Sequence, residues 1–156
     1  MSKRTIKLKK YLDIHVEGVA MEAITPGHLI EMHTDGKFKK HVTNGGFVSP
    51  MFALEDELQG KGINDNYATD DVVQAWIPQR GEEVYAILKN GETAVIGSML
   101  ESAGDGTLEV LDVVTADSDD AFTTVHNVVV AIALEAVDMS GSAGEDPSGR
   151  IKVRIV

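Results

Sequence analysis

The chain contains no cysteine, which excludes disulfides, thiolate metal sites and thiol catalysis. Aromatic residues make up only 5% of its 156 residues, so few side chains are available for stacking on nucleic-acid bases. No apolar run is long enough to span a bilayer, and charges interrupt the apolar pairs of the first ten residues, where a signal peptide would begin. We therefore expect a soluble, unprocessed chain with no membrane partner.

Charge is distributed unevenly along the chain, whose net charge is −11. Residues 1–41 contain eight Lys or Arg against five acids, residues 42–149 contain three against twenty, and residues 150–156 contain three against none. The acidic body would repel phosphates, so we expect no nucleic-acid partner. The basic ends suit contact with another acidic protein, although acidity can also simply keep an abundant protein soluble.

The hydrophobic pattern predicts one mainly β domain, a compact antiparallel β-barrel or sandwich-like fold with short helical segments. Two turn dipeptides each separate a pair of β-type runs and predict hairpins: Asp35-Gly36 between 28–33 and 38–42, and Asn90-Gly91 between 84–88 and 92–96. Further strands are expected at 107–114, 128–134 and 150–156, the last with one apolar and one basic face. Segment 125–139 could continue as helix through its alanines, but three consecutive valines favour strand. Helix is otherwise expected only at 51–58 and 70–76.

No catalytic motif is present: the G-x-S-x-G elbow, the S-x-x-K motif and the phosphate-binding P-loop are all missing. We therefore expect no catalytic residues, no metal, no cofactor and no enzymatic activity. His28, His33 and His41 lie near Glu31 and Asp35, which leaves an alternative open, a small β-barrel enzyme or ligand-binding protein with its site on this hairpin. Their spacing matches no zinc pattern, so surface histidines are the competing interpretation.

An acidic cluster at 117–120 has the sequence Asp-Ser-Asp-Asp and offers oxygen ligands of the kind that calcium prefers. Counted from Asp117, the sixth and twelfth positions hold Phe122 and Val128, where an EF-hand has glycine and glutamate. A solvated acidic loop is therefore the competing interpretation.

Several short motifs follow one another in a fixed order from residue 19 to residue 156. They are Thr25-Pro26-Gly27-His28-Leu29-Ile30, Phe52-Ala53-Leu54-Glu55, Gly60-Lys61-Gly62-Ile63, Asn66-Tyr67, Gly81-Glu82-Glu83-Val84-Tyr85-Ala86, the stretch from Leu100 to Leu108, and Ala133 to Ala136. In this order they resemble the capsid decoration, or cement, proteins of tailed bacteriophages. Each motif alone is turn chemistry with small apolar residues, so their order provides the specificity.

The resemblance implies a structural protein that binds the exterior of the expanded phage capsid. Such proteins act as homotrimers at three-fold and quasi-three-fold positions and cement neighbouring subunits of the major capsid protein. The resemblance further implies that the chain is made in the host cytoplasm and ends on the outer surface of the virion.

Residues 1–15 lie outside the resemblance and are interpreted as an extended N-terminal arm, followed by a β-rich decoration domain at 16–156. The capsid-binding residues expected in the arm are Lys3, Arg4, Ile6, Lys7, Leu8, Lys9 and Lys10. Two alternatives remain for this segment, a frayed terminus or, at 5–9, an edge strand that pairs with another chain. The scarce aromatic residues are interpreted as core or interface anchors, and those expected at the oligomer interface are Tyr67, Trp76 and Tyr85.

Overall fold

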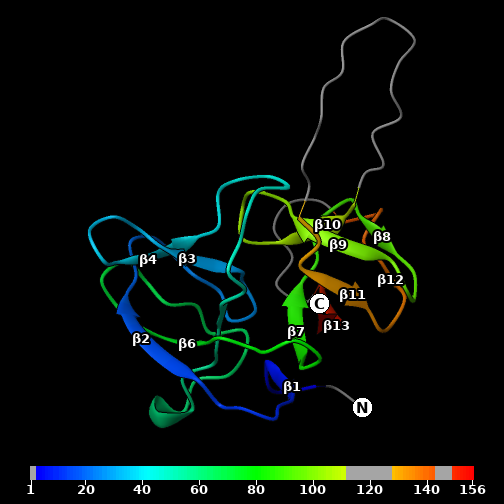
Figure 1. The fold of residues 1–156 in the computed structure, drawn as a ribbon. Coiled ribbons are helices and arrows are strands. Elements are labelled where there is room, and N and C mark those ends of the chain that lie inside the picture. The colour runs from blue at the N-terminus through cyan, green and yellow to red at the C-terminus, as the bar shows by residue number, and fades with distance from the viewer. Residues whose placement is uncertain (1–2, 112–127, 143–148) are drawn as a thin grey trace, which may run out of the picture.

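The computed structural model describes residues 3–111, 128–142 and 149–156, which are mainly β (Figure 1). Their one helical element is a short 3-10 turn, η1 (Glu57–Gln59). The strands are β1 (Lys7–Lys9), β2 (His15–Val19), β3 (Ile30–Met32), β4 (Phe38–Lys40), β5 (Phe52–Ala53), β6 (Val72–Trp76), β7 (Glu83–Ile87), β8 (Thr93–Ala94), β9 (Met99–Ser102), β10 (Leu108–Val110), β11 (Ala131–Ala133), β12 (Val137–Asp138) and β13 (Arg150–Ile155). No helix in these ranges has the length and apolar character needed to cross a membrane.

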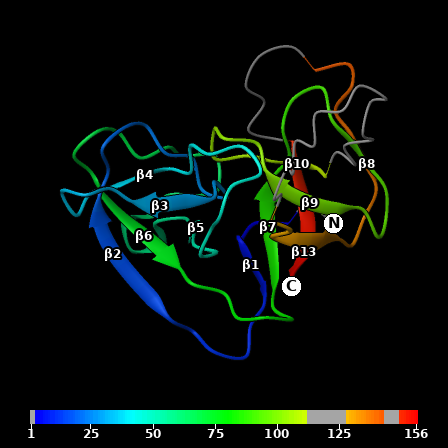
Figure 2. The ribbon, with the colours of Figure 1, turned by 45° about the horizontal axis from the view of Figure 1, so that its top comes forward.

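The strands form antiparallel sheets arranged in two lobes (Figures 1 and 2). One lobe holds a three-stranded sheet in the order β2-β6-β5 and the two-stranded sheet β3-β4. The other holds a six-stranded sheet in the order β1-β7-β13-β11-β9-β10 and the pair β12-β8. The predicted mainly β, sandwich-like class is thus confirmed, and the described part of the chain does not close into a barrel. Since β1 belongs to the second lobe, the chain starts in one lobe, builds the other and then returns.

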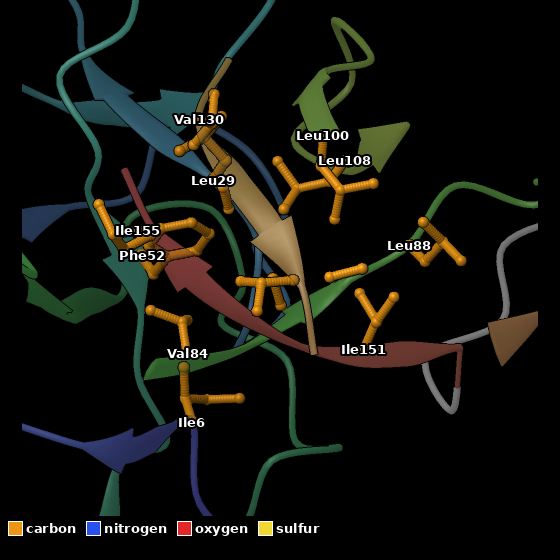
Figure 3. Close-up of a cluster of buried hydrophobic side chains, with 14 of the residues drawn as sticks. Ile6, Leu29, Phe52, Val84, Leu88, Leu100, Leu108, Val130, Ile151 and Ile155 are labelled. Atoms are coloured by element: carbon orange, nitrogen blue, oxygen red, sulfur yellow. The ribbon is translucent and has the colours of Figure 1, made fainter. Parts of the chain in front are cut away.

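The main core lies where the six-stranded sheet meets side chains from the first lobe (Figure 3). Leu29 and Phe52 of the first lobe pack in one cluster with Val84 of β7. Side chains along β13 alternate between the two faces of the sheet, of which one is buried. Its apolar residues Ile151, Val153 and Ile155 are buried, whereas Lys152 and Arg154 face outward. The predicted division of this strand into an apolar and a basic face is confirmed from Ile151 to Ile155, whereas Arg150 at its start is buried.

The two predicted hairpins have different outcomes. The first is confirmed, because β3 and β4 pair on either side of Asp35-Gly36. The second is wrong. The chain does reverse at Gly91, where φ is 88° and the N–H of Glu92 donates to the carbonyl of Lys89 (3.2 Å). However, β7 pairs with β1 and β13 while β8 pairs with β12. A turn fixes where the chain reverses, whereas burial against distant residues decides which strands pair.

Both helices predicted from the sequence are wrong. Within 51–58 the chain forms β5, and only η1 has a helical turn; 70–76 contains β6. The two strands pair with each other through Phe52 and Trp76, both completely buried. Burial on a sheet overrides the weak local helix propensity of such short segments.

The strands predicted in the C-terminal part of the chain can be compared with the structure where its residues are described. Segment 125–139 was expected as strand rather than helix, and its described part forms β11 and β12. In 107–114 the structure has β10, and the end of that range lies outside the described residues. The acidic cluster 117–120 also lies outside them, so the calcium interpretation stays a prediction.

Candidate functional site

The basic N-terminal segment forms the edge strand β1 of the six-stranded sheet (Figure 1). Ile6 is completely buried in the main core. Its carbonyl accepts a hydrogen bond from the N–H of Tyr85 (2.9 Å), and its own N–H donates to Glu55 Oε2 (3.1 Å). Lys3 Nζ donates to Glu135 at 2.6 Å. The edge-strand interpretation therefore describes residues 7–9, with this chain's own β7 as the partner. Movement of the segment as an arm on a capsid stays a prediction.

The turn between β1 and β2 is held by the buried carboxylate of Glu82. Its Oε1 accepts the N–H groups of Tyr11 (2.5 Å) and Leu12 (2.8 Å), and its Oε2 accepts the N–H of Gln79 (2.5 Å). Burial by itself would raise the pKa of Glu82, but these three hydrogen bonds to the ionised form bring that pKa below its ordinary value. The ionised anchor presents Tyr11 and Leu12 with 70% and 55% of their surface exposed.

A groove of about 450 Å³ runs between β1 and the segment that leads into η1. We call this the β1 groove; it is lined by Thr5, Lys7, Lys10, His15, Leu54, Glu55, Asp56, Glu57, Leu58 and Gln74. Basic side chains from the N-terminal segment and acidic ones from 55–57 therefore line the same groove. Leu58 is 91% exposed. A groove with this lining suits an extended polypeptide more than a small apolar ligand.

Positive charge is in excess on the basic side of the β1 groove. Asp13 accepts contacts from Lys7 (3.2 Å), Lys10 and His15 (2.7 Å). The hydrogen bond from Lys10 is the largest of the effects that hold the pKa of Asp13 well below its usual range. Because these groups are exposed, the pairs add little stability. Two lysines around one carboxylate leave a net positive charge here, which can attract the acidic groups of a partner.

The aromatic residues predicted at an oligomer interface do not meet at a surface. Trp76 is completely buried and Tyr67 is 2% exposed, with its hydroxyl donating to the carbonyl of Leu54 (2.8 Å). Their place in the core of a single chain leaves them no surface for a partner. Tyr85 is half-buried on β7, and Lys3 Nζ lies 4.6 Å from the centre of its ring. Of the three, only Tyr85 has surface to offer.

The three histidines of the alternative ligand site are held in separate environments. His28 is buried, accepts the N–H of Thr25 at Nδ1 (3.0 Å), and burial lowers its pKa to about 4. His41 is buried with its Nδ1 2.6 Å from Ser102 Oγ. His33 lies on the hairpin surface with its Nδ1 2.9 Å from Asp35. Across the described ranges, no group of three or more His, Cys, Asp or Glu side chains is placed to hold a metal ion.

The sequence interpretation missed the acidic residues that anchor the N-terminal segment. Glu55, Glu82 and Glu135 accept hydrogen bonds from residues that are 132 to 49 positions away in the chain. A signal was present, since a basic terminus and an acidic body were both visible in the sequence. That charge pattern predicts an external acidic partner, whereas several donors of the N-terminal segment contact acids of the same chain.

Comparison with known proteins gives a likeness in fold. No family model matches the chain, and no curated protein matches its sequence. Among solved structures, the chain is similar to the N base of head fibre gp8.5 of bacteriophage phi29. The likeness covers 93% of this chain and 95% of that chain, with a TM-score of 0.53 and 14% sequence identity. It shows a shared fold over nearly the full length of both chains.

Proposed function

We propose that this chain is a structural protein of a bacteriophage head and not an enzyme. The observation that supports this most is the fold shared with a phage head fibre base over 93% of the chain. The sequence motifs that resemble capsid decoration proteins point to the same class of protein. A likeness in fold and a likeness in motif order thus favour one functional class.

In this proposal the protein binds the exterior of the expanded capsid and cements neighbouring subunits of the major capsid protein. It does so as a homotrimer at three-fold and quasi-three-fold positions, on the outer surface of the virion. A protein that binds only the assembled lattice stabilises that lattice by mass action. Three linked copies engage three sites at high effective concentration, so modest single contacts become durable. None of this needs a cofactor, a nucleic acid or a membrane.

The surface around β1 is the proposed capsid contact. Arg4, Lys9 and Lys10 are exposed there, next in sequence to the exposed apolar side chains of Tyr11 and Leu12. Basic residues around exposed apolar ones suit an acidic protein surface, because charge speeds association and apolar contact slows dissociation. Among the other predicted contact residues, Lys3 and Lys7 are half-buried in pairs with acids, and Leu8 is half-buried. Ile6 is buried and acts as the anchor of the segment.

A pelleting experiment with phage heads tests the proposal. The purified protein is mixed with expanded and with unexpanded heads of a matched phage, and the pelleted heads are imaged by electron microscopy. We expect added density at three-fold positions on expanded heads only. If the protein pellets with neither form, the decoration function is wrong, and ligands of the β1 groove become the next candidates.

Reversing the two exposed charges at the end of β1 and directly after it is expected to weaken binding to expanded heads. We expect Lys9→Glu combined with Lys10→Glu to reduce the affinity at least about tenfold, or about 1.4 kcal/mol. The loss should shrink as salt is raised, because salt screens exposed charges. Quantitative pelleting at two salt concentrations measures both effects. Deleting the whole segment is a poorer test, since it also removes Ile6 from the core.

The matched control is Lys37→Glu combined with Lys39→Glu on the β3-β4 hairpin. Lys37 pairs with Asp70 at 2.8 Å and Lys39 pairs with Glu31 at 3.0 Å, as Lys10 pairs with Asp13. The control makes the same change in net charge at a different surface. Equal loss of binding in both double variants would mean that only net charge matters, and would contradict a contact at β1.

A further inference from the structure

An amine, a carboxylate and a carboxamide meet at the surface, where the loop after β4 contacts the second lobe. Glu109 of β10 is 9% exposed, and its two oxygens contact different partners. Lys89 Nζ lies 2.5 Å from Oε2, and Asn44 Nδ2 lies 2.5 Å from Oε1. A single carboxylate therefore bridges the side chains of Lys89 and Asn44. A bridge of this kind places a nucleophile and an acyl group against one general acid and base.

Backbone hydrogen bonds fix all three residues near one another. The N–H of Lys89 donates to the carbonyl of Leu108 (2.8 Å), the residue before Glu109. The N–H of Gly45, the residue after Asn44, donates to the carbonyl of Ser102 (2.8 Å). Ser102 lies in β9, which pairs with β10. The three side chains thus come from three segments that are tied together, and such fixed proximity replaces much of the entropy cost of a reaction between them.

The Asn44 side chain is also restrained on its own account. Its Nδ2 lies 3.4 Å from the carbonyl of Ala103. The turn beside it approaches so closely that a Cβ added to Gly104 would lie 3.0 Å from the backbone nitrogen of Asn44. Gly104 has a φ of 80°, which favours glycine here. The loop that carries Asn44 is therefore seated against the β9-β10 turn.

We propose that Lys89 and Asn44 form an intramolecular amide cross-link, with Glu109 as its catalytic acid and base. Nζ of neutral Lys89 attacks Cγ of Asn44, and a new C–N bond forms. Glu109, which holds the proton that the Lys89 ammonium gave up, passes that proton to Nδ2 and then takes the second proton from the attacking nitrogen. The bond between Cγ and Nδ2 then breaks, and ammonia leaves. One amine and one carboxamide become one secondary amide and one ammonia, so no oxidant, metal or cofactor takes part.

The ion pair between Lys89 and Glu109 slows this reaction. The hydrogen bond that Lys89 donates to Glu109 raises the pKa of Lys89, so the ammonium must first pass a proton to Glu109. We therefore expect the cross-link to form slowly in the folded protein rather than during folding. The competing attack on Cγ by the backbone nitrogen of Gly45 is hindered, because that N–H is held by Ser102.

The cross-link would join the two lobes covalently. Asn44 follows the β3-β4 hairpin of the first lobe, whereas Lys89 follows β7 of the second. Closing the chain between these positions removes conformations from the unfolded state, as a disulfide of the same span does. The cross-linked protein should therefore melt at a higher temperature than the uncrosslinked form.

Mass spectrometry of the aged, folded protein tests the proposal. We expect intact mass to fall by one ammonia and trypsin to leave Lys89 uncleaved, with its peptide joined to the one that contains Asn44. Three variants are aged in parallel: Lys89→Arg, Glu109→Gln and Asn44→Ala. Lys89→Arg is the matched control, because arginine keeps the ion pair with Glu109 but stays protonated and cannot attack.

Each result of this experiment either supports or contradicts the cross-link. Loss of ammonia with a joined peptide in the wild type, and in none of the variants, supports the cross-link. No mass loss in folded wild type after prolonged ageing overturns it. The same mass loss in Lys89→Arg indicates cyclisation at Asn44-Gly45 and also overturns it. Because Glu109→Gln could lose stability, its melting curve is recorded, and Lys89→Arg then carries the comparison alone.

Discussion

Glu82→Ala is expected to lower the free energy of unfolding by about 3–5 kcal/mol, because three backbone N–H groups lose one ionised acceptor together. The carboxylate is completely buried. Its partners Tyr11, Leu12 and Gln79 belong to two segments, so alanine releases the β1-β2 turn from the start of β7. Urea unfolding followed by circular dichroism measures the change. Glu57→Ala is the control, since Glu57 is an exposed glutamate of η1. Equal stability of the two variants would show that Glu82 is not an anchor.

The Glu82 carboxylate should also make the free energy of unfolding depend on pH. The folded pKa of Glu82 lies below the ordinary value of 4.5, so its contribution is present above that value. It is lost as pH falls through the lower folded pKa, where the folded state also takes up the proton. Glu82→Gln removes this part of the dependence. We therefore expect the gap in unfolding free energy between wild type and Glu82→Gln to be widest near neutral pH and to narrow in acid.

Two features of the fold that depend on local patterns were predicted correctly from the sequence. The alternation of β13 and the turn at Asp35-Gly36 are each encoded within a few residues, and both are confirmed. The pairing of β7 with β13 and of β8 with β12 joins residues about 45 to 70 positions apart. No local pattern specifies such pairings. The Asn90-Gly91 turn was therefore recognised correctly while its strands were paired wrongly.

The candidate site shows the same limit. The basic side chains at 3–10 were identified from composition, and three of them, Arg4, Lys9 and Lys10, are exposed. The anchors Glu55 and Glu82 were not, because an acid that accepts a backbone N–H leaves no trace in its own sequence neighbourhood. Glu82 is part of the acid-rich run Gly81-Glu82-Glu83, in which the two glutamates have different kinds of partner, and Glu82 accepts backbone N–H groups. Glu83 pairs with Lys152 (2.6 Å) on the outer face of the sheet.

Trp76→Ala is expected to lower the free energy of unfolding by about 3–5 kcal/mol, the cost of deleting a fully buried aromatic side chain. Trp76 is 0% exposed and belongs to the main core that joins the lobes. Its neighbours across the sheet are His15 of β2 and Phe52 of β5. A cavity there would loosen both the three-stranded sheet and the contact between lobes. Chemical unfolding measures the loss, and Trp76→Phe provides the graded comparison.

Trp76→Phe should cost much less, about 1–2 kcal/mol, because two effects oppose each other. The smaller ring leaves part of the space unfilled. However, the indole Nε1 is buried without an acceptor among the described residues, and phenylalanine removes that unpaired donor. The pair of variants also separates a core role from the interface role predicted for Trp76. If Trp76 is a core residue, Trp76→Phe lowers the free energy of unfolding and leaves the sedimentation of the folded protein unaltered. If Trp76 is an interface residue, Trp76→Phe shifts the distribution of oligomers, while the monomer unfolds as in the wild type.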